Sequence, residues 1–208
     1  ALNIDVPRSI ENLRFYAKAA AAQTTPAVAG ENSINYVLRQ PLGAVSLITP
    51  WNFPLHLLTW KLGPALAMGN SVIAKPSEIT PTTASMLGQL FAEVKAPDGL
   101  FNVVHGFGHE IGDALVRHPH VKAVSFTGGT ATGKTIATVA APLLKKTSFE
   151  LGGKNPSIVF ADCNLEQSIA SVARAAFFNS GQVCLCGSRV LVAAEIYDDF
   201  VDALVEQA

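Results

Sequence analysis

Three side chains in this sequence have types and settings that suit covalent chemistry. Cys184 follows the polar, glycine-containing turn Asn179–Gln182, and a cysteine becomes a nucleophile when a helix N-terminus or a cation stabilises its thiolate. Glu150 lies just before Gly152-Gly153, a flexible backbone that lets a carboxylate move as a general base must. The amide of Asn52 is suited to holding an oxyanion. Together they could perform nucleophilic chemistry on a carbonyl group.

Each of these residues also has a structural explanation. A lone cysteine is more often a buried structural residue, Glu150 could be an ordinary surface carboxylate, and Asn52 could serve only as a turn residue. Cys184 and Cys186 form a C-x-C pair, but no further pair of Cys or His residues with zinc spacing lies nearby. We therefore expect no metal site.

One segment matches a phosphate-binding motif completely. Residues 128–135 read G-G-T-A-T-G-K-T, which fits G-x-x-x-x-G-K-[ST] after a predicted strand. Ile158–Asp162 resembles the apolar strand ending in an aspartate that holds Mg²⁺ in P-loop NTPases. A P-loop NTPase using Gly128–Thr135 is one hypothesis. The alternative is a glycine-rich turn from a strand into a helix whose N-terminus faces an anion.

A second nucleotide signal is spread along the chain. Gly106-Phe107-Gly108, with Gly112 following, forms a loose dinucleotide-type loop. Lys75 and Glu78 flank a proline turn, and such a pair can hydrogen-bond ribose hydroxyls. The carboxylate would also repel a 2′-phosphate, which favours NAD over NADP. The alternative is an exposed surface pair with no ligand.

The elements that must position these residues alternate between short apolar runs and longer helical segments. Unbroken apolar strands, each followed by a helix, predict an α/β doubly wound fold with a mostly parallel sheet and a ligand at the carboxyl ends of its strands. The predicted strands are Ala44–Thr49, Ser71–Ala74, Phe101–Val104, Val121–Phe126, Ser157–Phe160 and Val190–Ala193. The predicted helices are Leu55–Met68, Thr82–Val94, Glu110–Val116 and Leu165–Phe178.

Composition excludes several classes of function. Of the 208 residues, 49% are hydrophobic and 15% charged, and the net charge is −1. The longest run of cations is Lys145-Lys146, so we expect no nucleic-acid partner. No apolar stretch reaches the roughly 18–20 residues of a membrane span, so we expect no membrane partner. Three cysteines, an odd number, favour reduced thiols in the cytoplasm.

Five segments resemble, in order and spacing, the signature motifs of the aldehyde dehydrogenase superfamily. These segments are Pro50–Pro54, Lys75–Glu78, Phe126–Gly128, Glu150–Lys154 and Gly181–Cys184. The resemblance covers essentially the whole chain. Under it, the match to the P-loop pattern is a coincidence, and Gly128-Gly129 is the turn into a helix beside the cofactor pyrophosphate. Many relatives carry serine at the position of Gly129.

The resemblance implies a mechanism and a cofactor. Cys184 attacks the aldehyde, Asn52 and the Cys184 backbone N–H hold the oxyanion, hydride passes to nicotinamide, and Glu150 activates water to release the acid. The cofactor is NAD, with NADP less favoured. The implied cofactor-binding residues are Thr49, Pro50, Trp51, Lys75, Glu78, Gly108, Gly112, Phe126, Gly128, Gly129 and Leu151.

The resemblance also implies a domain organisation. Residues 1–21 and 42–152 correspond to a Rossmann-like cofactor-binding domain whose N-terminal part is missing. Residues 22–41 match a strand that leaves this domain for oligomerisation, and residues 153–208 match the start of a second α/β domain, the catalytic domain. The chain is then a fragment of a longer protein, expected to bind a small-molecule aldehyde and to form a homo-oligomer, a dimer or a tetramer.

A narrower resemblance concerns the substrate. Asp5–Ile10, Leu58–Lys61 and Cys184–Cys186 are similar to the branch that oxidises 2-hydroxymuconate and 2-aminomuconate semialdehydes. It implies that Arg8, Phe53 and Phe178 line the substrate tunnel, where the Arg8 guanidinium could pair with a carboxylate. The alternative for Arg8 is a solvated arginine at a helix start. A P-loop NTPase and a non-catalytic nucleotide-binding fragment remain the alternative functions.

Overall fold

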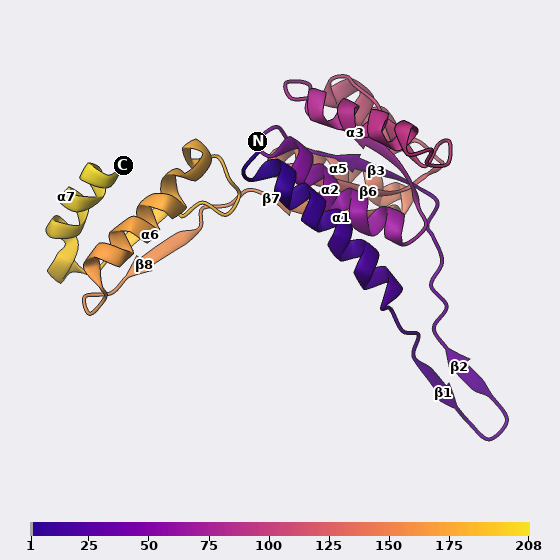
Figure 1. The fold of residues 1–208 in the computed structure, drawn as a ribbon, viewed down its shortest axis with the longest axis horizontal. Helices are drawn as coiled ribbons and strands as arrows, with labels where there is room; N and C mark the ends of the chain where they lie inside the picture. The colour runs from indigo at the N-terminus through magenta and orange to yellow at the C-terminus, as the bar shows by residue number, and fades with distance from the viewer. Residues whose placement is uncertain (1) are drawn as a thin grey trace. The chain divides into compact units, whose positions relative to one another are not determined.

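The computed structural model describes residues 2–208, which form two compact units. The first unit ends at Glu150, and the second is Leu151–Ala208. Each is described by itself (Figure 1). The assignment of a cofactor role to the first and a catalytic role to the second stays a prediction.

A five-stranded sheet forms the centre of the first unit. Its strand order is β5-β4-β3-β6-β7, and β3 pairs in parallel with both β4 and β6, as β4 does with β5. The strands are β3 (Ala44–Ile48), β4 (Ser71–Lys75), β5 (Phe101–Val103), β6 (Val121–Gly128) and β7 (Lys146–Leu151). The predicted α/β fold with a mostly parallel sheet is confirmed.

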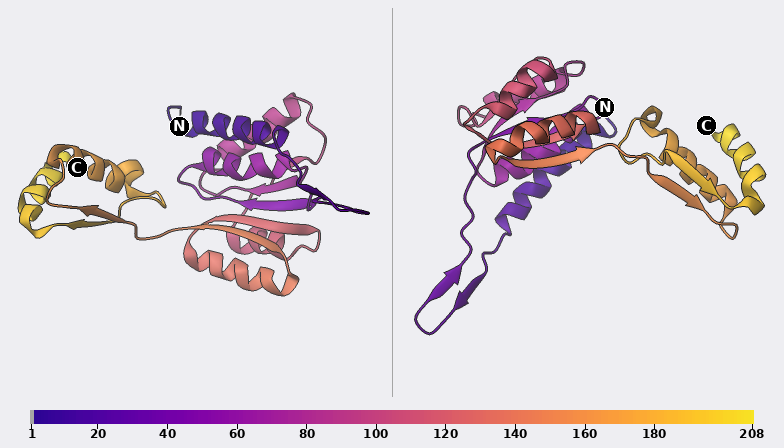
Figure 2. Two further views of the ribbon diagram at one scale, coloured as in Figure 1. Left: turned by 90° about the horizontal axis from the view of Figure 1, so that it is seen from below. Right: turned by 180° about the vertical axis from the view of Figure 1, so that it is seen from behind.

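Helices cover both faces of this sheet, which is why β3 and β4 could be recognised as unbroken apolar runs. Figure 2 shows α1 and α2 on one side of the sheet and α5 on the other. The helices are α1 (Asp5–Ala21), α2 (Pro54–Ala67), α3 (Thr82–Glu93), α4 (Asp113–Arg117) and α5 (Thr130–Ala140), with the π-helical turn η1 (Gly108–Gly112) before α4 and the 3-10 turn η2 (Ala141–Leu143) after α5. The core between α2, α3 and the sheet contains Val45, Leu47, Leu58, Leu62, Val72, Ala74, Ala84 and Leu87.

Polar contacts hold α1 against α2. The Asp5 carboxylate accepts hydrogen bonds from the backbone N–H groups of Leu55 (3.3 Å) and His56 (2.9 Å), which satisfies donors that a helix N-terminus leaves without partners. The Asn12 amide donates to the His56 carbonyl at 3.2 Å. The start of α2, which follows the Asn52 loop, is therefore fixed by a distant part of the chain.

An antiparallel hairpin interrupts the α/β alternation. It consists of β1 (Ala27–Ala29) and β2 (Ile34–Tyr36), and all six of their residues are exposed. The hairpin extends away from the sheet of its unit (Figure 1). The sequence predicted an excursion here with one strand-like stretch, and the structure adds a second strand. Its role in oligomerisation stays a prediction.

The second unit is a smaller α/β layer. Parallel strands β8 (Pro156–Val159) and β9 (Arg189–Val192) pack with α6 (Leu165–Phe177) and α7 (Tyr197–Gln207) around a core containing Val159, Ile169, Val172 and Phe200. The Asn164 side chain caps α6 by accepting from the Gln167 N–H at 3.0 Å. Two 3-10 turns, η3 (Phe178–Gly181) and η4 (Ala194–Ile196), follow α6 and β9. No helix within residues 2–208 is long and apolar enough to cross a membrane.

Candidate functional site

The strand order of the first unit creates a crevice at one edge of the sheet. From β3 the chain proceeds outward through β4 and β5, and then returns to place β6 on the opposite side of β3. The loops that leave β3 and β6 therefore diverge, and ligands of doubly wound sheets bind at such a point. Thr49 follows β3 at this edge, and Phe126–Gly128 end β6, with Ile48 paired to Phe126. The sequence-predicted residues of these two loops thus lie side by side.

A pocket of about 540 Å³ opens beside this crevice. Its walls come from the ends of β3 and β6, from η1 and α4, and from α5. They include Ile48, Gly108, Gly112, Val116, Phe126, Thr132 and Ile136. The lining combines apolar side chains and two glycines with the polar residues His109, Asp113 and Thr135, so the pocket suits a flat ring that carries polar groups at its edge. Gly108, Gly112 and Phe126 are brought together as the sequence predicted.

Two features of this edge of the sheet suit a polar ligand. The hydroxyl groups of Thr49 and Thr127 are buried and have no hydrogen-bond partner within residues 2–208, although buried polar groups almost always have one. Gly129 precedes the first turn of α5, and a Cβ built on it meets nothing within 4 Å. An open helix N-terminus that directly follows a strand of the sheet can bind a phosphate group of a nucleotide. The residues present therefore fit a dinucleotide.

Lys75 and Glu78 differ in exposure, and only Glu78, with 44% of its side chain exposed, fits the surface pair that the sequence left open. Only 3% of the Lys75 side chain is exposed, and its Nζ lies 3.4 Å from Glu78 Oε2. Lys75 Nζ also donates to the Pro76 carbonyl at 3.0 Å. A hydrogen bond from its own backbone N–H and the nearby Lys75 lower the pKa of Glu78, so at neutral pH the crevice contains a carboxylate.

The P-loop hypothesis is wrong. A phosphate-cradling loop must lie between the strand and the helix, with its GK-[ST] end at the helix start. Here α5 already begins at Thr130, so Gly133, Lys134 and Thr135 lie inside it. The Gly133 N–H donates to the Gly129 carbonyl at 3.0 Å as a regular helical bond. The Thr135 hydroxyl likewise donates to the Ala131 carbonyl, which leaves no loop to surround a phosphate.

The loop between β3 and α2 carries the predicted amide. Asn52 is half-buried, and its Oδ1 accepts a hydrogen bond from the Phe53 N–H at 3.2 Å. The amide nitrogen is the hydrogen-bond donor of this side chain. The side chain of Trp51 is 43% exposed, and the Phe53 ring contacts His56 edge-on at 6.3 Å between centroids. Pro50, Trp51, Asn52 and Phe53 thus form one short segment after Thr49.

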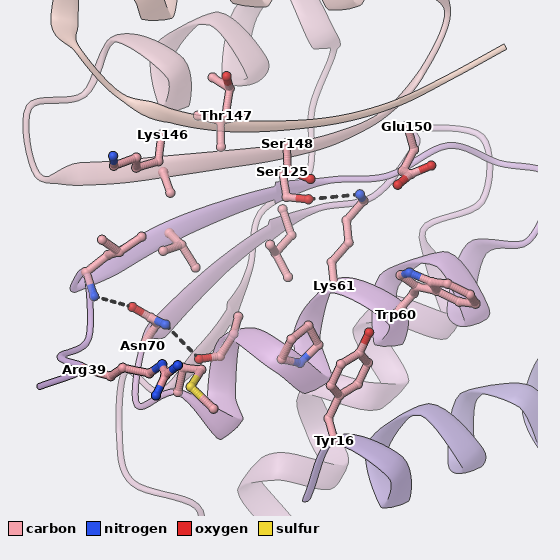
Figure 3. A pocket seen from close by; sticks show the side chains of 18 of the residues that line it. Tyr16, Arg39, Trp60, Lys61, Asn70, Ser125, Lys146, Thr147, Ser148 and Glu150 are labelled. Carbon is pink, nitrogen blue, oxygen red and sulfur yellow. Dashed lines mark hydrogen bonds between the residues drawn. The ribbon is translucent and has the colours of Figure 1, made fainter. Parts of the chain in front are cut away.

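Sequence reasoning missed a buried cation near Glu150. Lys61 of α2 is buried, and its Nζ donates to Ser125 Oγ at 2.9 Å. Burial lowers its pKa to about 8, and the charge of Glu150 partly opposes this shift. Both side chains border a hollow of about 650 Å³ between α2 and strands β3, β6 and β7, and Figure 3 shows the Lys61 ammonium next to the Glu150 carboxylate. Lys61 can therefore gain and lose a proton nearer to neutral pH than an exposed lysine does.

The loop that carries Cys184 lies in the second unit. Three consecutive residues before it have left-handed backbones, with φ of 53° at Asn179, 56° at Ser180 and 71° at Gly181. Such conformations are costly for residues other than glycine and occur preferentially at functional sites. Cys184 is half-buried, whereas Cys186 is buried. The Cys184 thiol is therefore partly accessible, whereas the Cys186 thiol is not.

Asn155 anchors this loop, and sequence reasoning missed it. Its Nδ2 donates to the carbonyl oxygens of Cys184 at 2.6 Å and Cys186 at 3.2 Å. One amide thus fixes the backbone on both sides of Leu185. The available signal was the position of Asn155 directly after Gly152–Lys154 in a matched motif.

The remaining predicted residues, two for the substrate and one for the cofactor, belong to both units. Arg8 is in α1, 65% exposed, with its guanidinium 3.9 Å from the Glu11 carboxylate. Phe178 directly follows α6, as the first residue of η3, and belongs to the second unit. Leu151 ends β7 at the boundary between the units. Across the described residues, no group of three or more Cys, His, Asp or Glu side chains could hold a metal ion.

Comparisons with known proteins agree with these features. The family profile described as "Aldehyde dehydrogenase family" matches residues 1–208. A 2-aminomuconic semialdehyde dehydrogenase from Danio rerio is 49% identical over 99% of the chain, and a 2-hydroxymuconic semialdehyde dehydrogenase from Pseudomonas sp. (strain CF600) is 47% identical over 98%. The chain spans 43% of each relative. The NAD⁺ complex of an aldehyde dehydrogenase from Bacillus cereus superimposes with a TM-score of 0.97 at 41% identity, covering the whole chain and 43% of that structure.

Proposed function

The chain belongs to the aldehyde dehydrogenase family, and we propose that the whole protein oxidises an aldehyde to a carboxylic acid with NAD as its cofactor. The observation that carries the proposal is the crevice at the carboxyl edge of the sheet. The buried Lys75 ends β4 at this edge, and the open N-terminus of α5 follows β6 beside the pocket that Ile48 and Phe126 line. A nucleotide cofactor accounts for all of them.

Cys184 is the proposed nucleophile. Its thiolate adds to the aldehyde carbon, and the amide of Asn52 and the Cys184 backbone N–H hold the oxyanion that forms. Asn155 fixes the carbonyl of Cys184, which holds the backbone of the nucleophile in one orientation. Loss of hydride then converts the adduct into a thioester on Cys184.

The cofactor crevice would hold NAD through named residues. Thr49, Lys75 and Glu78 would bind ribose hydroxyls, the turn Gly128-Gly129 would face the pyrophosphate, and Gly108, Gly112 and Phe126 would border the adenine. When bound, NAD supplies the acceptor for the hydride that leaves the adduct. Pro50, Trp51 and Leu151 would border the same cofactor.

Glu150 is the proposed general base for hydrolysis of the thioester. It is the second-last residue of β7, and Gly152 and Gly153 follow directly after Leu151, so its carboxylate can move to take a proton from water. Lys61 lies close enough to interact with the charge of Glu150. Above pH 8 the neutral amine of Lys61 can accept the proton from Glu150 and pass it on.

A carboxylate-bearing semialdehyde is the proposed substrate. The two relatives described above are named for muconic semialdehydes, which combine an aldehyde with a carboxylate. Arg8 is one candidate partner for this carboxylate, although its side chain is 65% exposed and lies 3.9 Å from the Glu11 carboxylate. We also propose that the exposed hairpin β1–β2 contributes to a homo-oligomer.

Cofactor choice tests the proposed function. Calorimetry on the whole protein is expected to show binding of NAD and no comparable binding of Mg·ATP. Glu78→Gln should raise the affinity for NADP relative to NAD by about tenfold, because a carboxylate next to the ribose repels a 2′-phosphate. Glu93→Gln, an exposed carboxylate at the end of α3, serves as the matched control. Failure of NAD to bind would refute the proposal.

Lys61 predicts a pH dependence. Its pKa of about 8 means that the amine form increases as pH rises through 8, so hydrolysis of the thioester should accelerate over that interval. Lys61→Met should remove the acceleration, whereas Lys18→Met, on an exposed lysine of α1, should keep it. Single-turnover rates from pH 6.5 to 9.5 measure the effect. An unchanged profile in Lys61→Met would exclude Lys61 from the proton path.

A further inference from the structure

A pocket of about 450 Å³ in the second unit has no role in the function proposed so far. It lies between α6 and the loop that carries Cys184. One wall belongs to α6 and its end, and the other belongs to the loop. The wall residues that matter here are Ser171, Arg174, Phe178, Val183 and Leu185.

The helix wall places a hydroxyl and a guanidinium together. Ser171 and Arg174 are three positions apart on α6, so they lie on one face of the helix. Phe178 continues the same face one turn later. This wall therefore offers two hydrogen-bond donors next to an aromatic ring.

The loop wall connects the pocket to the nucleophile. Val183 and Leu185 are the two neighbours of Cys184 in the chain, and both line the pocket. Leu185 is 81% exposed, so its side chain is accessible to a molecule in the pocket. A molecule in this pocket would lie beside the residue assigned as the nucleophile.

Arg174 differs from the other cations of this unit. Residues 151–208 contain Lys154, Arg174 and Arg189 as their only Lys and Arg residues. Arg189 already donates its Nε–H to the Lys154 carbonyl at 2.9 Å. Arg174 is exposed and takes part in none of the four ion pairs found within residues 2–208. It also borders a smaller hollow of about 290 Å³ next to Phe177 and Gln207, which does not reach the Cys184 loop.

We propose that the pocket between α6 and the Cys184 loop binds the carboxylate end of an acidic aldehyde, with Arg174 as the specificity-determining residue. The guanidinium fork pairs with both carboxylate oxygens, the arrangement that arginine favours. The Ser171 hydroxyl donates a further hydrogen bond. Phe178, Val183 and Leu185 contact the hydrocarbon chain between the acid and the aldehyde. The inference rests on the proposed function, because it assigns the distal end of a substrate whose aldehyde reacts at Cys184.

Two aldehydes of equal chain length test this assignment in the whole protein. The substrate 6-oxohexanoate carries a carboxylate, and hexanal does not. Arg174→Ala should lower kcat/KM for 6-oxohexanoate by roughly 10- to 100-fold, mainly through KM, and should change the value for hexanal by less than about twofold. Arg174→Lys should restore part of the loss, because it keeps the charge but not the fork. Arg14→Ala, on an exposed arginine of α1 outside the same ion pairs, should behave as the wild type.

A second measurement needs no turnover. Adipate, an unreactive six-carbon dicarboxylate, should slow the alkylation of Cys184 by iodoacetamide in the wild type, followed by mass spectrometry of the peptide that contains Cys184. Arg174→Ala should lose this protection and keep the same alkylation rate without adipate.

The outcomes separate this inference from the proposed function. Equal losses on both aldehydes, or no loss on either, would overturn the role of Arg174 while leaving aldehyde oxidation intact. A wild-type protein that oxidises neither aldehyde would refute the proposed function instead. In that case adipate protection that depends on Arg174 would still support a carboxylate site, and its absence would overturn it.

Discussion

Replacing Cys184 by alanine is expected to abolish aldehyde oxidation by the whole protein. Alanine has no sulfur to form the covalent adduct, so kcat should fall on the order of 10³-fold or more. NAD should still bind, because Cys184 is not among the walls of the pocket assigned to the adenine. Steady-state oxidation of an aldehyde and calorimetry with NAD on the same preparation measure both expectations.

The other two cysteines are the matched controls for this change. Cys186 is buried, with its Sγ 3.8 Å from the Phe178 carbonyl oxygen, and Cys163 packs against the core of the second unit. Cys186→Ala and Cys163→Ala should therefore retain most of the activity at temperatures where the protein is folded. Substantial turnover by Cys184→Ala, or its loss in both controls as well, would show that Cys184 is not the nucleophile.

The clearest strand predictions were β3 and β4, whose side chains are buried on both faces. β3 and β4 each consist of five residues that are buried or partly buried, so their apolar runs were visible in the sequence. β7 was missed because most of its side chains are exposed and it reads Lys-Thr-Ser-Phe-Glu-Leu, with no apolar run. Backbone hydrogen bonds alone can hold such a strand at the edge of a sheet. It therefore does not need the apolar side chains that would reveal it in the sequence.

Helix α1 was missed for a related reason. Its two buried residues are Asp5 and Ser9, both polar, and a pattern of apolar residues cannot reveal them. Asp5 is buried because its carboxylate accepts two N–H groups at the start of α2. That partnership joins residues 50 and 51 positions apart in the chain and is visible only in the folded structure.

The candidate site likewise contains some residues that could be predicted from the sequence and others that could not. Loops that follow buried strands could be predicted to meet at one edge of the sheet, and Thr49, Lys75 and Phe126 do lie there. Lys61 could not be foreseen, since a lysine in a helix is normally exposed and its partner Ser125 is 64 positions away. The P-loop error has a local cause, because the motif specifies residue types but not where the helix begins.

Replacing Glu150 by glutamine is expected to separate the two halves of the reaction. Formation of the thioester on Cys184 does not require a base at position 150, so the first turnover should proceed with a burst of NADH. Hydrolysis of the thioester does require one, and an amide cannot take a proton from water, so this step should slow by roughly 10²- to 10⁴-fold. The acyl group should then accumulate on the peptide that contains Cys184, and stopped-flow absorbance and mass spectrometry measure the burst and the adduct.

Glu166→Gln is the matched control for this change, because Glu166 is an exposed carboxylate in the first turn of α6 and should leave both steps unaltered. Glu150 has one competing role to be tested, in which its carboxylate deprotonates the Cys184 thiol. Under that alternative the burst itself would slow as much as the steady state, and no thioester would accumulate.

The two roles also differ in their link to Lys61. A base that acts on water passes its proton to the buried amine, so Lys61→Met should slow only the hydrolysis step in the wild-type background and add little in Glu150→Gln. Additive losses in the double variant would show that the two side chains act independently, and the proton path from water through Glu150 to Lys61 would then be excluded.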